Sequence, residues 1–209
     1  MSQPVVYVVS AARTAIGSFG GALKDVPLAA LATTAVRAAL ARSGVPPDEV
    51  GHVAMGNVIP TEPRDAYLSR IAAIDAGLPK EVPAFNVNRL CGSGLQAIVS
   101  AAQSLMLGDA ALAIGGGAES MSRGPYLMTA GRWGIRMGDS TLLDYTVGVL
   151  QDPFGRIHMG LTAENVAAKF GIDRAAQDAL ALASHQRAVA AIAGGRFRSE
   201  EHTSELQSP

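Results

Sequence analysis

The only cysteine of the chain, Cys91, stands directly before Gly-Ser-Gly and a long run without charged residues. The apolar pattern that follows predicts a helix, which places Cys91 at a helix N-terminus, where the dipole and free backbone N–H groups stabilise a thiolate. Gly92 and Gly94 let the backbone approach whatever the sulfur attacks, and the same N–H groups can hold a developing oxyanion. The pattern indicates a nucleophile for acyl transfer, and an inert buried thiol fits the position about equally well.

A competing interpretation of the same stretch is dinucleotide binding. The letters "GSGLQA" fit the G-x-G-x-x-A fingerprint and lie between a predicted strand and a predicted helix. That fingerprint normally has an acidic residue at the end of the next strand, but this strand ends in three glycines, 115–117, with Asp109 before it and Glu119 beyond it. No lysine follows these glycines as a phosphate-binding P-loop requires, so both nucleotide-binding hypotheses are disfavoured.

Other residues with chemical potential have ordinary structural explanations when they are considered alone. His158 is more often a satisfied structural histidine than a binding residue, and Met159 more often fills a core. His52, at the start of a predicted strand, and His185, in a predicted helix, favour the same structural interpretation. We expect no metal site.

Composition excludes several classes of protein. With 209 residues and 48% hydrophobic side chains the chain can bury a substantial core. A formal net charge of −1 and 17% charged residues give no basic field for nucleic acid or a membrane surface. A single cysteine makes no intramolecular disulfide. The apolar run near the N-terminus is not preceded by the basic region of an export signal, and it is too short to span a bilayer. We expect a cytoplasmic protein.

Strand and helix patterns alternate along the first part of the chain, which predicts an α/β fold with a mainly parallel sheet. The helix at 95–107 carries an apolar stripe and no charge, so we expect it to be buried on all sides between layers. The predicted strands are 5–10, 50–59, 82–88 and 110–117; the predicted helices are 27–44, 66–77, 95–107, 162–170 and one that follows Asp173 and ends at Gly194.

Residues 118–160 change character, because they are rich in Met, Gly and Arg and show weak periodicity. This composition predicts a long excursion of loops and short helices. We divide the chain into a core at 1–120, a loop-domain segment with following helices at 121–197, and a tail at 198–209.

Four separated motifs resemble the thiolase family: "RTAIGSFGG", "NRLCGSGLQAI", "GGGAESMSRGPY" and "HMGLTAENVA". With "NVIPTEPRD" and "DPFGRIHMG" the chain looks most like the N-terminal half of bacterial β-ketothiolases. The resemblance implies a thiolase-like layered fold with a buried catalytic helix and a partial loop domain. It also implies an acyltransferase in which a cysteine takes an acyl group from an acyl-CoA as a thioester and passes it to acetyl-CoA, or the reverse cleavage by CoA.

Carried onto this sequence, the resemblance assigns Cys91 as the nucleophile. His158 and Met159 then contact the pantetheine and acyl parts of the substrate, and Leu150 lines the CoA tunnel. The three glycines at 115–117 let the chain pass close to the catalytic helix. The partners implied are acyl-CoA and CoA with no resident cofactor, and the implied assembly is a homo-oligomer, a tetramer in full-length relatives.

The resemblance also identifies what this chain lacks. In the family, a histidine in a "GHP"-type motif and a cysteine in a "CGG"-type motif of the second half complete the catalytic site, and neither motif is present. The tail "RSEEHTSELQS" matches the translation of a common sequencing adapter, so we treat 198–209 as non-native. We therefore expect an inactive N-terminal half. The alternatives are a noncatalytic acyl-CoA-binding module and a related decarboxylating condensing enzyme, against which "HMGLTAEN" argues.

Overall fold

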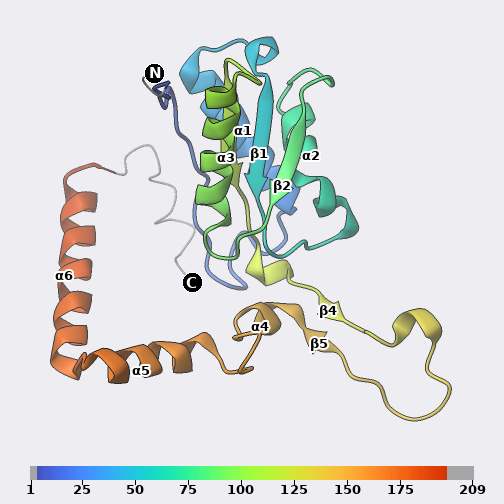
Figure 1. Cartoon of the computed structure of the whole chain (residues 1–209), viewed down its shortest axis with the longest axis vertical. Helices are drawn as coiled ribbons and strands as arrows, with labels where there is room; N and C mark the ends of the chain where they lie inside the picture. Colours follow the sequence, from blue (N-terminus) through green and yellow to red (C-terminus); the bar gives the residue numbers. More distant parts are fainter. Residues whose placement is uncertain (1–3, 197–209) are drawn as a thin grey trace.

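A three-stranded parallel sheet forms the centre of the computed structural model, which describes residues 4–196 (Figure 1). The strand order is β2-β1-β3, with β1 at His52–Gly56, β2 at Ala84–Val87 and β3 at Ala113–Gly117. In register, Gly56 stands between Val87 of β2 and Gly117 of β3, so all three strands end at the same edge. The predicted α/β fold with a parallel sheet is confirmed.

Two helices cover one face of this sheet. Helix α1 (Leu28–Ser43) and helix α2 (Leu68–Asp75) pack on each other, and they enclose the main apolar core with Val53 and Met55 of β1. Gly44 ends α1 in the left-handed conformation that glycine adopts without strain. Short 3-10 helices at Pro47–Glu49 and Pro63–Tyr67 precede β1 and α2. The sequence pattern predicted both α-helices at these positions.

Helix α3 (Ser93–Leu107) covers the opposite face and comes unusually close to the strands (Figure 1). Small residues make this contact: Ala97 and Ala101 are buried against Ala54 of β1. A Cβ placed on Gly115 would lie 2.7 Å from Cα of Ile98, and one on Gly56 would lie 2.4 Å from the carbonyl carbon of Ser93. Both distances are shorter than atoms tolerate, so glycines permit the close approach, as predicted for 115–117.

The other side of α3 carries large apolar side chains that remain exposed. Leu95, Ile98, Val99, Met106 and Leu107 are between 40% and 79% exposed. The expectation that this helix is covered on all sides therefore holds for one side only, because no element among residues 4–196 packs on the second side. By length and composition the segment Leu90–Leu107 passes the test for a membrane-crossing helix, a test that core helices also pass. Its Ala97 and Ala101 side packs on the sheet.

The predicted buried strand at 5–10 is wrong. These residues form no strand, and Val5, Tyr7, Val8 and Val9 are more than 60% exposed. At the end of this segment, Ser10 Oγ donates a 2.6 Å hydrogen bond to the carbonyl of Ala39 in α1. The β-branched run identified the right intrinsic preference, but a strand needs a partner strand, and this segment pairs with none in the described chain.

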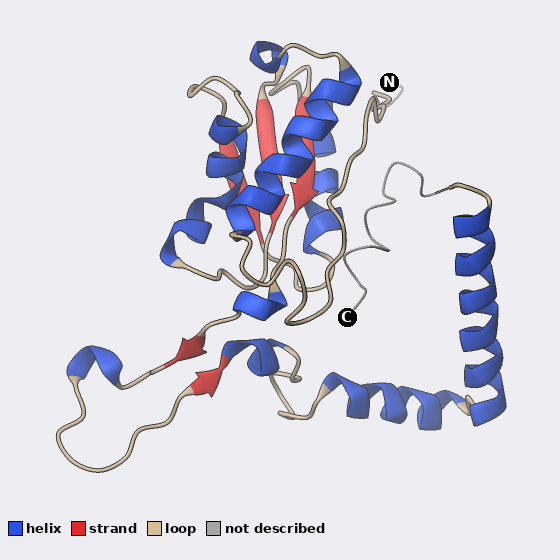
Figure 2. Ribbon diagram, turned by 180° about the vertical axis from the view of Figure 1, so that it is seen from behind, coloured by secondary structure: helices blue, strands red, loops and turns tan. Residues whose placement is uncertain are grey.

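Beyond β3 the chain leaves the sheet, as the weak periodicity predicted (Figure 2). Within this excursion a short antiparallel pair, which the sequence did not indicate, closes the loop 128–142. Asp173 caps the last helix, because its side chain accepts a hydrogen bond from the N–H of Ala176. The elements are a 3-10 helix at Met121–Arg123, β4 at Tyr126–Leu127, a 3-10 helix at Gly131–Trp133, β5 at Leu143–Asp144, α4 at Tyr145–Val149, α5 at Met159–Phe170 and α6 at Arg174–Ala193.

Helices α5 and α6 extend away from the sheet and have no buried residue (Figure 1). The division of the chain at 120 and 121 stays a prediction. The tail at 198–209, predicted to be non-native, lies outside the described residues.

The contact of α3 with the sheet can be tested with two neighbouring glycines of β3. Gly115→Ala would push a methyl group into the backbone of α3, whereas a Cβ on Gly116 would meet only the Met55 side chain, at 3.4 Å. We expect Gly115→Ala to lower the free energy of unfolding by about 1–3 kcal/mol, the usual cost of overpacking. Gly116→Ala, the matched control, should change it little. Urea unfolding followed by circular dichroism measures both, and equal effects would contradict the proposed contact.

Candidate active site

A tight turn between β2 and α3 presents Cys91. Gly92 N–H donates to the Arg89 carbonyl at 3.1 Å, and Ser93 N–H donates to the Leu90 carbonyl at 2.9 Å. Leu90 takes a positive φ of 47°, which is rare for a side chain of this size. The strand therefore reverses within a few residues, and this reversal leaves Cys91 exposed at the tip.

The first turn of α3 has no side-chain cap. Gly92 occupies the N-cap position and makes no side-chain hydrogen bond to the helix. The Ser93 N–H donates to the Leu90 carbonyl, so the N–H groups of Gly94 and Leu95 are the ones without an intrahelical partner, at the positive end of the dipole. The predicted position of Cys91 at a helix N-terminus is confirmed. Its exposure argues against the inert buried thiol that the sequence left open.

The start of α3 is held against the strand ends. The Ser93 backbone lies against Gly56 of β1, and a Cβ on Gly117 would be 3.4 Å from Cα of Gly94. Gly94 differs from these glycines, because a Cβ there would meet nothing within 4 Å. The space beside Gly94 is therefore open.

Glu119 connects the segment that follows β3 with the segment that follows β1. The sequence alone indicated no role for it. Its Oε1 accepts from Asn57 Nδ2 at 2.8 Å and from Ile59 N–H at 2.9 Å, and its Oε2 accepts from Val58 N–H at 2.9 Å. Burial raises the pKa of the Glu119 carboxyl above its ordinary value, the hydrogen bonds from Ile59 and Val58 oppose the rise, and the charge of Asp65 adds to it. The carboxyl and its three donors connect the segments that follow β1 and β3, next to Gly56 and Gly117.

A second polar cluster holds the loop that follows β1. Asp65 is fully buried, and its Oδ2 accepts from the Thr61 hydroxyl at 2.6 Å and from the Thr61 N–H at 2.7 Å. Asn86 of β2 accepts from Ser69 N–H at 2.8 Å and donates to the Asp65 carbonyl. The sequence signal for Asn86 is its place as a polar residue within a strand pattern. A buried polar side chain there needs hydrogen-bond partners on neighbouring elements.

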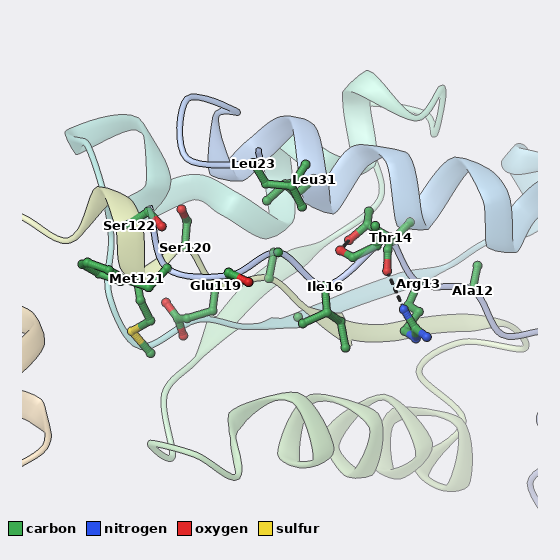
Figure 3. A pocket seen from close by; sticks show the side chains of 17 residues that line it. Ala12, Arg13, Thr14, Ile16, Leu23, Leu31, Glu119, Ser120, Met121 and Ser122 are labelled. Carbon is green, nitrogen blue, oxygen red and sulfur yellow. Dashed lines mark hydrogen bonds between the residues drawn. The ribbon is translucent and has the colours of Figure 1, made fainter. Parts of the chain in front are cut away.

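A cavity of about 400 Å³ lies between the N-terminal segment 12–19 and the chain that leaves β3 (Figure 3). Arg13, Thr14 and Ile16 line it from one side and Glu119, Ser120 and Met121 from the other. Leu23 and Leu31 close it above. Cys91 does not line this cavity, so the cavity and the exposed thiol are separate features.

The three predicted substrate-binding residues lie together in the excursion. The Met159 N–H donates to the Leu150 carbonyl at 2.9 Å, and His158 pairs with Gln151 in an antiparallel bridge. His158 caps α5, because its Nδ1 accepts from Gly160 N–H at 3.0 Å. The side of the molecule that holds α4 and the start of α5 is also the side at which the strands end (Figure 1). Within the described residues no hydrogen bond joins these three residues to Cys91.

The remaining histidines take structural positions. His52 stacks at a tilt on Phe85 of the neighbouring strand, with ring centroids 5.5 Å apart. His185 is exposed on α6. Among residues 4–196 no group of His, Cys, Asp and Glu is arranged to hold a metal ion.

Comparisons with known proteins place this geometry in a family. The model described as "Thiolase, N-terminal domain" matches residues 6–201. Beta-ketothiolase BktB of Cupriavidus necator is 63% identical over 195 residues, which are 93% of this chain and 50% of that protein. Cytosolic acetyl-CoA acetyltransferase of Mus musculus is 46% identical over 200 residues, 95% of this chain and 50% of that protein.

Solved structures agree with the sequence relatives. Human mitochondrial 3-ketoacyl-CoA thiolase in complex with CoA superimposes with a TM-score of 0.88 at 42% identity, over 93% of this chain and 50% of that one. The chain spans about half the length of the curated relatives it matches.

The Glu119 carboxyl has a predictable pH signature. Because its folded pKa is raised, the folded chain holds this proton more tightly than the unfolded chain. The stabilisation is complete below the ordinary pKa of 4.5 and is lost as pH rises through the folded value. We expect the free energy of unfolding of the wild type, relative to Glu119→Gln, to fall as pH rises from 4.5 toward neutrality. Urea unfolding across this range measures it, and a rising difference would mean that the hydrogen bonds outweigh burial.

Proposed function

The chain belongs to the thiolase family, and we propose that Cys91 is the nucleophile of its acyl-transfer reaction. The reaction is the cleavage of a 3-ketoacyl-CoA by CoA, or the reverse condensation of an acyl-CoA with acetyl-CoA. One observation carries the proposal: the only thiol is exposed at the uncapped N-terminus of α3, on a tight turn that ends the sheet.

In the cleavage direction, the Cys91 thiolate attacks the C3 carbonyl carbon of the 3-ketoacyl-CoA. The bond between C2 and C3 then breaks, its electron pair leaves with acetyl-CoA as the carbanion, and a proton neutralises that carbanion. The acyl group remains on Cys91 as a thioester. The thiol of a second CoA loses its proton and attacks this thioester, which releases the shortened acyl-CoA and restores the thiolate.

The described residues support specific parts of this reaction. The free N–H groups at the start of α3 can stabilise the thiolate and the oxyanion that forms on the attacked carbonyl. A Cβ on Gly94 would meet nothing within 4 Å, so a substrate carbonyl has room to approach the start of α3 there. We propose that Leu150, His158 and Met159 bind the pantetheine and acyl parts of the substrate from the excursion. The reaction needs no resident cofactor beyond the CoA thioesters themselves.

The general base is proposed to come from the second half that the relatives possess. Within residues 4–196 no histidine is hydrogen-bonded to Cys91, and the histidine proposed to bind substrate, His158, uses its Nδ1 to cap its own helix. We therefore expect the 209-residue chain alone to show no turnover. The same observation favours a second candidate function, binding of acyl-CoA without catalysis.

The exposed apolar side of α3 supports the need for more protein around this half. Leaving apolar surface in water forfeits roughly 25 cal/mol for each Å². For large side chains such as Leu95 and Leu107, a few such residues weigh heavily against a net stability of about 5–15 kcal/mol. We propose that the complete enzyme is a cytoplasmic homo-oligomer, a tetramer, that binds neither nucleic acid nor membrane.

Acylation of Cys91 is the direct test. In a version completed with a second half, incubation with acyl-CoA should leave the acyl group on Cys91, located by mass spectrometry of peptides. Cys91→Ser should lower thiolysis of a 3-ketoacyl-CoA by about a thousandfold or more, the usual loss when a covalent nucleophile is removed. The chain as it stands is the control without a base. An adduct elsewhere, or full turnover in Cys91→Ser, contradicts the assignment; binding of acyl-CoA without turnover in the completed version favours the second candidate.

His158 should contribute to substrate use more than to folding. In the completed version, His158→Ala should lower kcat/KM for the acyl-CoA about tenfold or more, by removal of a substrate contact. His185→Ala, on the exposed face of α6, is the matched control and should leave kcat/KM unchanged. Steady-state kinetics and the thermal midpoint are compared for both variants. Unchanged kinetics with a lowered midpoint in His158→Ala would show that its role is to cap α5.

A further inference from the structure

The hydroxyl of Ser93 is hydrogen-bonded to both Arg89 and Leu90, the two residues that precede Cys91. It accepts a hydrogen bond from Arg89 N–H at 2.8 Å and donates one to the Leu90 carbonyl at 2.6 Å. Ser93 is only 4% exposed, whereas Cys91, two residues earlier, is exposed. The buried Ser93 hydroxyl therefore stabilises, through its hydrogen bonds, a turn in which Cys91 is exposed to solvent; we call this pair of hydrogen bonds the Ser93 tie.

Leu90 needs this tie because its backbone is in a disfavoured region. At a φ of 47° its Cβ crowds its own backbone, a position that glycine occupies without penalty. Packing of the side chain does not hold Leu90 there, since it is 53% exposed. Hydrogen bonds hold it: those of the Ser93 hydroxyl, one from Leu90 N–H to Asn88 Oδ1 at 3.0 Å, and one from Ser93 N–H to the Leu90 carbonyl at 2.9 Å.

Ser93 is itself anchored to the sheet. Its carbonyl carbon would lie 2.4 Å from a Cβ on Gly56, so its backbone rests directly on β1. This contact restrains the position of Ser93, and the hydrogen bonds of its hydroxyl in turn restrain Arg89 and Leu90. Its hydroxyl is directed back to the turn and does not cap the helix, so it occupies neither the Gly94 N–H nor the Leu95 N–H.

We propose that Ser93 is a positioning residue for Cys91. Its hydroxyl keeps Leu90 in the left-handed conformation, and this keeps the Cys91 sulfur at the N-terminus of α3. The inference rests on the proposed role of Cys91 as a nucleophile. It adds that the reactivity of the thiol depends on a neighbouring side chain that does not touch the substrate.

The 209-residue chain offers a clean measurement, because Cys91 is its only thiol and every alkylation event reports on it. The second-order rate constant for iodoacetamide at neutral pH is compared between the folded chain and the same chain in urea. We expect the folded wild type to react faster. Ser93→Ala should slow the reaction about tenfold, within the range of a helix-terminus interaction.

Two further variants separate positioning from general loss of structure. Ser104→Ala removes a hydroxyl from the same helix, where it bonds only to the carbonyl of Ser100, and should react as fast as the wild type. Leu90→Gly combined with Ser93→Ala should recover most of the lost rate, because glycine adopts a positive φ without the tie. Circular dichroism follows the helical content of each variant.

Each outcome supports or overturns a specific statement. A folded wild type that reacts no faster than its urea-unfolded form contradicts the proposed nucleophile. An activated wild type with an equally fast Ser93→Ala overturns the role of Ser93 and leaves the nucleophile intact. Slow Ser93→Ala with lost helical content and no recovery in the double variant also overturns it, because the hydroxyl would then hold the helix. Recovery in the double variant supports the proposal.

Discussion

The close approach of helix α3 to the sheet is the constraint on which the site depends. Backbone meets backbone at Gly56 and Gly115, where even a methyl group would come within 2.7 Å of the helix. Such a contact leaves α3 little freedom to slide or rotate, because interiors packed at this density transmit any shift. The position of the helix N-terminus, and therefore of Cys91, is set by two strands that contribute no catalytic group.

Polar side chains complete this frame at the end of the sheet. Glu119 joins the segments that follow β1 and β3, with both carboxyl oxygens accepting hydrogen bonds. Ser93 ties the turn above them. Each is at least partly buried and has partners, as polar groups in such positions generally require. Cys91, the proposed nucleophile, is exposed, whereas Ser93, which holds the turn, is buried.

The two faces of the sheet differ in completeness. On the side of α1 and α2, large apolar residues such as Leu28 and Met55 are fully enclosed. On the other side, α3 buries small residues against the strands and turns large ones, Leu95 among them, to solvent. This asymmetry agrees with a chain that spans about half the length of its relatives. It also agrees with the finding that, among the described residues, no histidine is hydrogen-bonded to Cys91, the proposed nucleophile.

The sequence by itself determined five of the six α-helices of the described residues, the strands β1, β2 and β3, and the place of Cys91. These follow from local patterns: apolar periodicity, a glycine that ends α1, an aspartate that caps α6, and a thiol directly before a helix. The resemblance in four motifs led to the family, which the comparisons confirm. Leu150, His158 and Met159 were proposed as substrate contacts on that resemblance, and their roles stay predictions.

Only the tertiary structure decided the rest. It left residues 5–10 without a partner strand, although their β-branched side chains favour one, because strand pairing is a nonlocal contact. It revealed the role of Glu119, whose carboxyl accepts hydrogen bonds from Asn57 and Val58. These donors lie about sixty residues away in the sequence, a separation that no local pattern encodes. It also showed that Ser93, read in the sequence as one letter of a glycine-rich motif, directs its hydroxyl back to the turn. Hydrogen bonds of this kind depend on φ and on burial, and both are set only when the helix settles on the sheet.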